Sequence, residues 1–335
     1  MPILDAHDPQ ALARAVRALV AGELIGLPTE TVYGLAARAD DDVAVARIYA
    51  AKGRPRSHPL IVHVADARSA EAFVPESVGL GARARALMSR FWPGPLTLVV
   101  PRRPGLAEAA AAGASTVALR CPDHPAALAL LRAAAAAGVP GVAAPSANRF
   151  GRVSPTRAEH VAEEFGTALP VLDGGPCREG IESAIVDCSR ARAYLLRPGT
   201  LSRAALEAAL GEPLHDPDAH APRVPGSLAS HYAPAAGVHL CAPAELAACV
   251  RAELAAHPGE RVGVYSRRPS DVASGSGGLV AAWPMPDNAG QAAHELFAVL
   301  RRFDAQGVRS IWVEQPPADP AWDGVRDRLA RAATR

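Results

Sequence analysis

Short apolar runs recur along the first two hundred residues, separated by stretches with helical spacing. We predict buried strands at 24–27, 60–63, 96–100, 115–120, 142–144, 171–173, 184–186 and 193–196. Apolar residues recur on one helical face over 9–21, 42–51, 69–73, 80–91 and 124–137, which predicts helices. Strands that alternate with helices indicate an α/β domain whose sheet is mainly parallel or mixed.

The pattern changes between residues 211 and 236, where proline and histidine are frequent and no period is visible. Such a stretch is typical of a linker. Beyond it, strands are predicted at 238–240, 261–265, 279–281 and 309–313, and helices at 244–255, 288–303 and 322–333. We therefore expect a domain over 1–210, a linker over 211–236 and a smaller, Rossmann-like α/β domain over 237–335.

Composition narrows the class of protein. Of the 335 residues, 49% are hydrophobic and 21% charged, which is typical of a soluble globular protein. The net charge of +1 argues against a protein that wraps nucleic acid, although it leaves a local basic patch open. The five cysteines lack C-x-x-C or metal-ligand spacing, so we expect reduced thiols. The N-terminus has no signal-peptide pattern and no apolar run could span a bilayer, so we expect a cytoplasmic location and no membrane contact.

A cationic turn precedes the second strand. Lys52 and Arg54 flank Gly53, and Arg56 follows. One interpretation is a solvated basic turn. The other is a phosphate clamp, because lysine supplies a compact charge and arginine a fork for bidentate contacts.

Other polar residues follow predicted strands, and each has two interpretations. Arg120 and Arg197 either reach solvent or pair with a substrate carboxylate. Ser146 and Asn148 either form a turn or donate to phosphate or ribose oxygens. His63 is either a core or edge histidine or a site residue.

The helix expected after residue 156 needs an N-cap, for which Ser154 or Thr156 is the candidate. No G-x-S-x-G, H-E-x-x-H or Walker sequence is present, and no nucleophile–base pair stands out. We therefore expect chemistry by positioning and charge neutralisation, with no metal ligated by protein side chains.

Seven motifs occur in a fixed order: PTETVYGL, K-x-R-P followed by HPLIVH, WPGPLTLVV, VALRCPDHP, APSANRFGRVSPT, GGPCREGIESAIVD and LLRPG. This series closely resembles the threonylcarbamoyl-AMP synthases, the family built on the YrdC-like domain, over about residues 12–210. The HYAP segment and the C-terminal α/β domain resemble the long, two-domain form of that family. The resemblance implies a YrdC-like twisted sheet with flanking helices in the first domain.

The resemblance also implies a function. Members condense L-threonine, bicarbonate and ATP into threonylcarbamoyl-adenylate and release pyrophosphate, as nucleotidyltransferases. This is the first step of N6-threonylcarbamoyladenosine modification, and partner proteins then transfer the group to tRNA. Mg²⁺ is expected with ATP, held through water and phosphate oxygens. Weak contact with tRNA is a further expectation.

Site residues follow from the motif positions, with Lys52 and Arg54 as the expected catalytic phosphate-binding pair. His231 and Tyr232 resemble a linker segment that folds back over the nucleotide cleft. The expected ATP contacts are Lys52, Arg54, His58, Thr116, Ser146, Asn148, Ser154, Arg197, His231 and Tyr232. The expected threonine contacts are Thr31, His63, Arg120, Ala144 and Ser183.

The chain departs from the family pattern at several positions. His58 and Asp327 stand where asparagine is common, and Ala184 replaces a common threonine. The linker lacks the methionine and basic-aromatic residues seen in some relatives. Two other functions remain open: an RNA-binding YrdC-like module and a carbamoyltransferase with another acceptor.

Overall fold

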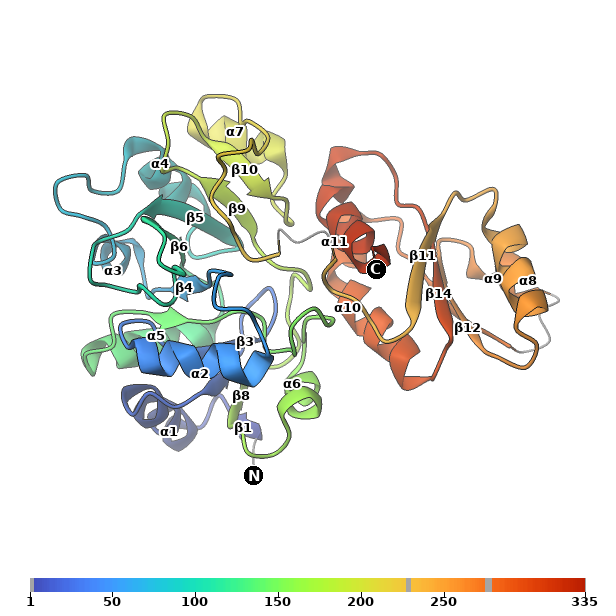
Figure 1. Cartoon of the computed structure of the whole chain (residues 1–335), viewed down its shortest axis with the longest axis horizontal. Coiled ribbons are helices and arrows are strands. Elements are labelled where there is room, and N and C mark those ends of the chain that lie inside the picture. Colours follow the sequence, from blue (N-terminus) through green and yellow to red (C-terminus); the bar gives the residue numbers. More distant parts are fainter. Residues whose placement is uncertain (1–2, 227–229, 275–278, 335) are drawn as a thin grey trace. The chain divides into compact units, whose positions relative to one another are not determined.

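The computed structural model describes residues 3–226, 230–274 and 279–334 (Figure 1). The chain forms two compact units. The first comprises Met1–Phe150 and Ser154–Ser227, and the second comprises Gly151–Val153 and Leu228–Arg335. No helix in the described ranges has the length and apolar character that crossing a membrane requires.

The first unit is built on a sheet whose described strands are β1 (Ile3–Asp5), β2 (Ile25–Leu27), β3 (Gly34–Arg38), β4 (Ile61–His63), β5 (Leu96–Pro101), β6 (Thr116–Arg120), β7 (Val142–Ala143), β8 (Val171–Asp173), β9 (Ala184–Asp187) and β10 (Tyr194–Arg197). Their order in the ten-stranded sheet is β1-β8-β2-β3-β7-β4-β6-β5-β9-β10. β4 and β6 pair in parallel, whereas β5 and β6 pair antiparallel. The sheet is therefore mixed, which is one of the two predicted types.

Helices cover this sheet: α1 (Pro9–Val20), α2 (Asp42–Lys52), α3 (Ala67–Glu71), α4 (Ala82–Phe91), α5 (Pro125–Ala136), α6 (Ala158–Phe165) and α7 (Arg203–Leu210). One apolar cluster joins α1 and α5 to β2 and β7. A larger cluster joins α2 and α4 to β4, β5 and β6. The two clusters form the core that fixes the strand ends.

Strand β3 was not predicted from the sequence. Its residues, GLAAR, include two alanines, which have low β propensity, and they lack period-two alternation. The strand pairs with β2 and β7 along its two edges. Its faces are buried because Leu35 and Ala37 pack in the larger apolar cluster and Ala36 packs in the other. Burial on both faces removes the alternation that would identify a strand in the sequence.

The predicted N-cap of α6 was wrong. Arg157 occupies the cap position and makes no side-chain capping hydrogen bond. Ser154 Oγ instead donates to Glu182 Oε1 at 2.5 Å. The Thr156 N–H donates to His160 Nδ1 at 3.2 Å. The Ser154 hydroxyl thus hydrogen-bonds to the buried Glu182 carboxylate instead of capping α6.

The stretch after α7 packs on the first unit although it lacks regular elements. Leu214 is buried in the larger apolar cluster. His215 pairs with Tyr194 of β10 through an isolated bridge. The Arg190 guanidinium forms an ion pair with Asp218 at 2.9 Å. These contacts hold the stretch in place up to the residues near 225.

The second unit contains a parallel sheet of β11 (Gly237–Cys241), β12 (Val262–Ser266), β13 (Val280–Pro284) and β14 (Ser310–Glu314), in the order β11-β14-β12-β13. Its helices are α8 (Leu246–Ala256), α9 (Pro269–Ala273), α10 (Ala289–Ala305) and α11 (Asp323–Ala333), with a 3-10 turn at Pro320–Trp322. In Figure 1, α8 and α9 lie on one face of this sheet and α10 and α11 on the other. The expected Rossmann-like architecture is confirmed.

Candidate functional site

A row of buried polar residues crosses three adjacent strands of the first unit. The strand register pairs His63 of β4 with Arg120 of β6, and Arg120 with Thr97 of β5. All three side chains are buried. Residues in register point to the same face of a sheet, so the row presents an imidazole, a guanidinium and a hydroxyl side by side.

The row borders an apolar floor on the same face. Ile61, Val99, Ala118 and Ile185 form a cluster with Val224, which comes from the stretch after α7. Thr116 lies on β6 four residues from Arg120, and hence about 13 Å along the strand on the same face. The apolar floor is therefore long enough to separate polar groups near Thr116 from those near Arg120.

Arg120 does not reach solvent. Its Nη2 atom lies 2.7 Å from Glu30 Oε1, and the two side chains are 4% and 1% exposed. Apart from this ion pair, neither carboxylate oxygen of Glu30 accepts a hydrogen bond from the described residues. Glu30 is a residue that the sequence interpretation missed. A buried ion pair with unused hydrogen-bonding capacity is costly, which favours a ligand-binding role.

Thr31 and Ser183 join this polar end through hydroxyl contacts. Thr31 follows Glu30 directly, and its Oγ1 lies 2.9 Å from Thr29 Oγ1. Ser183 Oγ lies 2.7 Å from Thr97 Oγ1. The strand register and the Thr97–Ser183 contact therefore bring His63, Arg120 and Ser183 together. Thr31 is buried and directly follows Glu30, the ion-pair partner of Arg120.

The fifth expected threonine contact, Ala144, lies beside this set. Its main-chain N–H donates to Ile61 O at 3.0 Å. A Cβ atom added to Gly34 would lie 3.0 Å from the Ala144 Cβ atom. The start of β3 at Gly34 and the residue after β7, Ala144, are thus closely packed.

Arg197 is buried and does not reach solvent. Its Nε and Nη2 atoms donate to Ser183 O at 3.0 and 2.9 Å. Its Nη1 atom donates to Pro225 O at 2.9 Å. The guanidinium therefore ties the stretch that covers the floor to the residue that borders the polar row.

The cationic turn begins where α2 ends. Asp41 caps the start of the helix, and Gly53 ends it with a φ of 65°. A glycine is favoured there because L side chains are strained in the left-handed region. This stop places Lys52 on the last helical turn and Arg54 in the loop beyond it.

Lys52 is buried, with only 3% of its surface exposed. Its Nζ atom donates to Ser146 O and Asn148 O, both at 2.5 Å. Burial, and next the nearby Arg54 charge, lower the pKa of Lys52 well below its usual range. The two carbonyl groups therefore fix the position of an ammonium group that has little access to water.

Arg54 is also buried, at 7% exposed, whereas Arg56 is exposed. Arg54 Nε donates to His58 O at 3.3 Å, and Nη2 donates to Pro59 O at 3.0 Å. The guanidinium lies 5.7 Å from the centroid of the Phe150 ring, which the His58 ring also meets edge-on. The interpretation as a solvated turn is wrong for Lys52 and Arg54 and holds for Arg56 alone.

His63 is held in its neutral form. Burial, and next the Arg120 charge, lower the pKa of its imidazole to about 3. Its Nδ1 atom has no hydrogen-bond partner in the described ranges of the chain. The ring can therefore contact a ligand without adding charge at neutral pH.

Two expected ATP contacts, His231 and Tyr232, belong to the second unit. Tyr232 is 1% exposed and stacks on Phe297 of α10 with ring centroids 5.4 Å apart. The His231 N–H donates to Arg331 O at 3.2 Å. Tyr232 has a φ of 61°, which is uncommon for an aromatic residue. These contacts fasten the HYAP segment to the helices of its own unit.

This arrangement suits a polyanion at one end and a small zwitterion at the other. Buried cations bind phosphate more strongly than exposed ones, because the local dielectric is low. Within the described residues, no group of three or more His, Cys, Asp and Glu side chains could hold a metal ion.

Two family models match the chain. The Sua5, YciO and YrdC family, described as "Telomere recombination", matches residues 17–199. The family described as "Threonylcarbamoyl-AMP synthase, C-terminal domain" matches residues 201–334. Together they span both units.

Curated relatives and solved structures agree with these matches. The threonylcarbamoyl-AMP synthase of Bacillus subtilis is 39% identical over 98% of this chain and 94% of the relative. That of Pyrococcus abyssi is 38% identical over 93% of this chain and 91% of the relative. The crystal structure of P. abyssi Sua5 complexed with L-threonine superposes with a TM-score of 0.85 at 34% identity, covering 99% of this chain and 98% of that one.

The fold and the buried polar ends define a two-domain α/β enzyme that brings a nucleotide and a small substrate together. The chain belongs to the threonylcarbamoyl-AMP synthase family. Its reaction is the ATP-dependent formation of threonylcarbamoyl-adenylate from L-threonine and bicarbonate. The family resemblance drawn from the motifs is confirmed.

Proposed function

We propose that the two ends of the apolar floor divide the substrates between them. Lys52 and Arg54 hold and neutralise the triphosphate. Thr31, His63 and Arg120 hold L-threonine, with Arg120 facing its carboxylate. Ala144 and Ser183 complete the threonine end. His58, Thr116, Ser146, Asn148 and Ser154 complete the ATP end.

The observation that carries this division is the burial of both cationic groups in separate polar networks. Lys52 is held by carbonyl groups of the loop that contains Ser146 and Asn148. Arg120 instead forms its ion pair with Glu30. A carbamate oxygen is a weak nucleophile that must approach a polyanion, so cations at one end and a positioned amino acid at the other lower the barrier.

We propose a positioning role for Arg197 at the ATP end, because its guanidinium holds Ser183 through both the main-chain oxygen and Oγ and holds Pro225 through its main-chain oxygen. For His231 and Tyr232 we keep the proposal that the segment closes over the nucleotide. The division of the chain at 1–210, 211–236 and 237–335 likewise stays a proposal.

Mg²⁺ would accompany ATP through phosphate oxygens and water, since it keeps several waters and needs few protein ligands. The metal would add to the positive charge that Lys52 and Arg54 supply to the triphosphate. Omission of Mg²⁺ should therefore abolish turnover. Restored turnover with Mn²⁺ would fit the same role.

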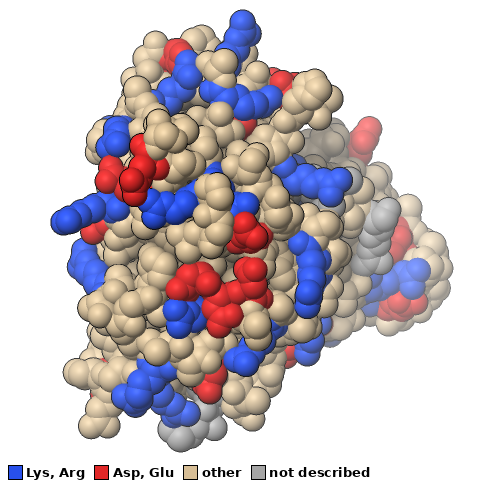
Figure 2. Space-filling model, turned by 60° about the vertical axis from the view of Figure 1, so that its left-hand side comes forward, with Lys and Arg blue, Asp and Glu red and all other residues tan. Residues whose placement is uncertain are grey.

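Transfer of the product to tRNA requires further proteins, and we propose a cytoplasmic location where these act. Contact with tRNA would be weak. On the face drawn in Figure 2, lysine and arginine side chains are interspersed with aspartate and glutamate, so that face offers no continuous basic surface.

The test is pyrophosphate release with threonine, bicarbonate or ATP omitted in turn, with the product identified by mass. Arg120→Ala should raise the threonine KM and leave the ATP KM nearly unchanged. A variant that changes only the ATP KM would contradict the proposed division. Turnover with carbamoyl phosphate in place of threonine would instead support the carbamoyltransferase alternative, and a tRNA gel shift without turnover would support the RNA-binding one.

A further inference from the structure

The second unit contains a pocket of about 530 Å³ at the edge where its parallel strands end. Residues that follow or end each strand line it: Pro243 after β11, Arg267 after β12, Asp287 after β13 and Glu314 at the end of β14. In open parallel sheets, the crevice outside the carboxyl ends of the strands is the usual place for a ligand. The residues that line this pocket would therefore contact a ligand of the second unit.

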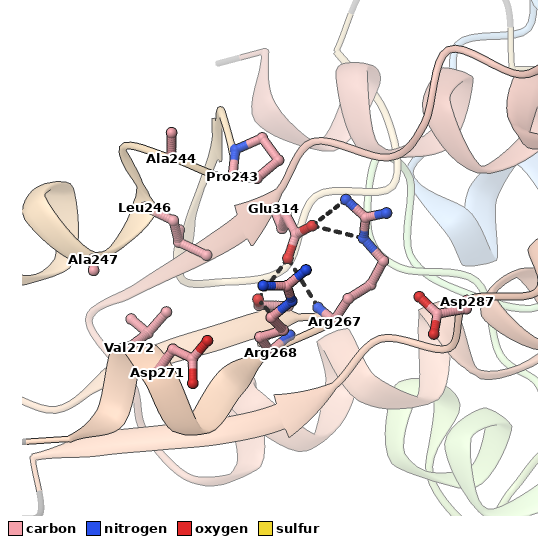
Figure 3. Close-up of a pocket in the computed structure, with 11 residues that line it drawn as sticks. Pro243, Ala244, Leu246, Ala247, Arg267, Arg268, Asp271, Val272, Asp287 and Glu314 are labelled. Carbon is pink, nitrogen blue, oxygen red and sulfur yellow. Dashed lines mark hydrogen bonds and ion pairs between the residues drawn. The ribbon is translucent and has the colours of Figure 1, made fainter.

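One wall of the pocket is held by a buried carboxylate. Glu314 Oε2 accepts from Ser266 Oγ at 2.6 Å and from the Arg267 N–H at 2.9 Å. Glu314 Oε1 accepts from Arg267 Nε at 2.6 Å. Figure 3 shows this network in the middle of the close-up. Three hydrogen bonds to one carboxylate make this wall rigid.

The opposite wall lacks such a network. It consists of Pro243, Ala244, Leu246 and Ala247, which Figure 3 shows apart from the arginines. These residues belong to the turn from β11 into the first turn of α8. Glu245, at the N-cap of α8, makes no side-chain capping hydrogen bond.

Cysteines flank residues 242–248, the segment that forms this apolar wall. Cys241 is the last residue of β11, and Cys249 lies in α8. Both are free thiols, with their Sγ atoms 3.2 Å apart. A disulfide needs a separation of about 2.0 Å, so the two sulfurs are already in contact but must approach further to bond.

We propose that Cys241 and Cys249 are a site of reversible oxidation by small-molecule disulfides, and that the bond between them fixes the apolar wall of the pocket. Cys249 loses its proton to solvent, and its thiolate attacks one sulfur of the small disulfide, which releases one small thiolate. Cys241 then loses its proton to solvent and attacks the Cys249 sulfur of the mixed disulfide, which releases the second thiolate. Two protein thiols are oxidised while one small disulfide is reduced to two thiols.

The surroundings of the two sulfurs suit these two roles. Cys249 is half-buried, so a small disulfide can reach its sulfur more readily than that of the buried Cys241. Cys241 is buried, and burial together with the hydrogen bond to Cys249 raises its pKa to about 11. It therefore stays protonated while Cys249 reacts, and its own deprotonation follows. The other three cysteines lie in the first unit.

The test treats the full-length protein with oxidised glutathione, quenches in acid, counts thiols after unfolding and maps disulfides by mass spectrometry. Wild type should lose two of its five thiols and yield a Cys241–Cys249 cross-linked peptide, with a mass loss of about 2 Da for two hydrogen atoms. Cys241→Ser should stop at a glutathione adduct on Cys249. Cys188→Ser, in the half-buried cysteine of the first unit, should behave as wild type.

Amide hydrogen exchange tests the effect on the pocket. Exchange over residues 242–248 should slow at least tenfold in the oxidised protein, because the loop is closed at both ends, and reducing agent should restore the original rate. Wild type that stops at the same glutathione adduct as Cys241→Ser would overturn the proposed disulfide. A disulfide with unchanged exchange over 242–248 would overturn its role in fixing the wall.

Discussion

Replacement of Lys52 by methionine tests whether a buried ammonium group is the main source of charge neutralisation. Methionine has a similar volume and keeps the side chain apolar along its length, so the cavity that alanine would leave is avoided. The substitution removes the charge and the hydrogen bonds to Ser146 O and Asn148 O. The rest of the loop keeps its packing.

The expected change in stability is small because two effects oppose each other. A carbonyl that loses a donor costs at most about 1–3 kcal/mol, and Ser146 O keeps the hydrogen bond from the Asn148 N–H at 3.0 Å. Removing an ammonium that is only 3% exposed relieves a desolvation penalty of several kcal/mol. We expect the free energy of unfolding to change by no more than about 2 kcal/mol, as the difference of these terms.

The expected change in rate is large. A donor or cation aimed at developing charge in a water-excluded site contributes about 3–4 kcal/mol, so kcat should fall roughly 10²–10³-fold. The assay is threonine-dependent pyrophosphate release at saturating substrates. The control is Arg56→Met, which removes the exposed cation of the same turn and should leave kcat within about twofold. A folded Lys52→Met variant with more than a tenth of wild-type kcat would refute the reasoning.

Three further predictions follow from buried groups. Glu30→Gln should lower the free energy of unfolding by about 3 kcal/mol, because Arg120 stays buried without its counter-charge. It should also raise the threonine KM more than the ATP KM; the reverse order in steady-state kinetics would count against the assignment. As pH falls from 6.5 to 5, His63 becomes protonated in the unfolded state. It stays neutral in the folded state, where its pKa is about 3. Stability should therefore fall by up to about 2 kcal/mol in urea unfolding, and His63→Gln should lack this component; an equal slope in both proteins contradicts it. Tyr232→Ala should destabilise the second unit by about 3–5 kcal/mol through lost packing on Phe297, measured by thermal unfolding. An unchanged unfolding transition would mean that the segment serves only the nucleotide.

The sequence predicted most strands and helices close to their observed bounds, because short apolar runs and helical spacing report burial directly. It failed at β3, where alanines are buried on both faces and no alternation remains. It also failed at the cap of α6, because the Ser154 hydroxyl hydrogen-bonds to Glu182, which is distant in the sequence. In both cases, contacts between residues far apart in the sequence outweighed the local preference for a strand pattern or a helix cap.

The sequence by itself determined the order of motifs, and hence the family and the residue types at the site. It left open whether Lys52, Arg54 and Arg120 face solvent, because burial depends on what packs over a side chain and not on its neighbours in the chain. Only the tertiary structure placed Arg120 against Glu30 and brought Cys241 to Cys249. Charge and reactivity are properties of residue types, whereas desolvation and pairing arise only when strands and loops far apart in sequence meet.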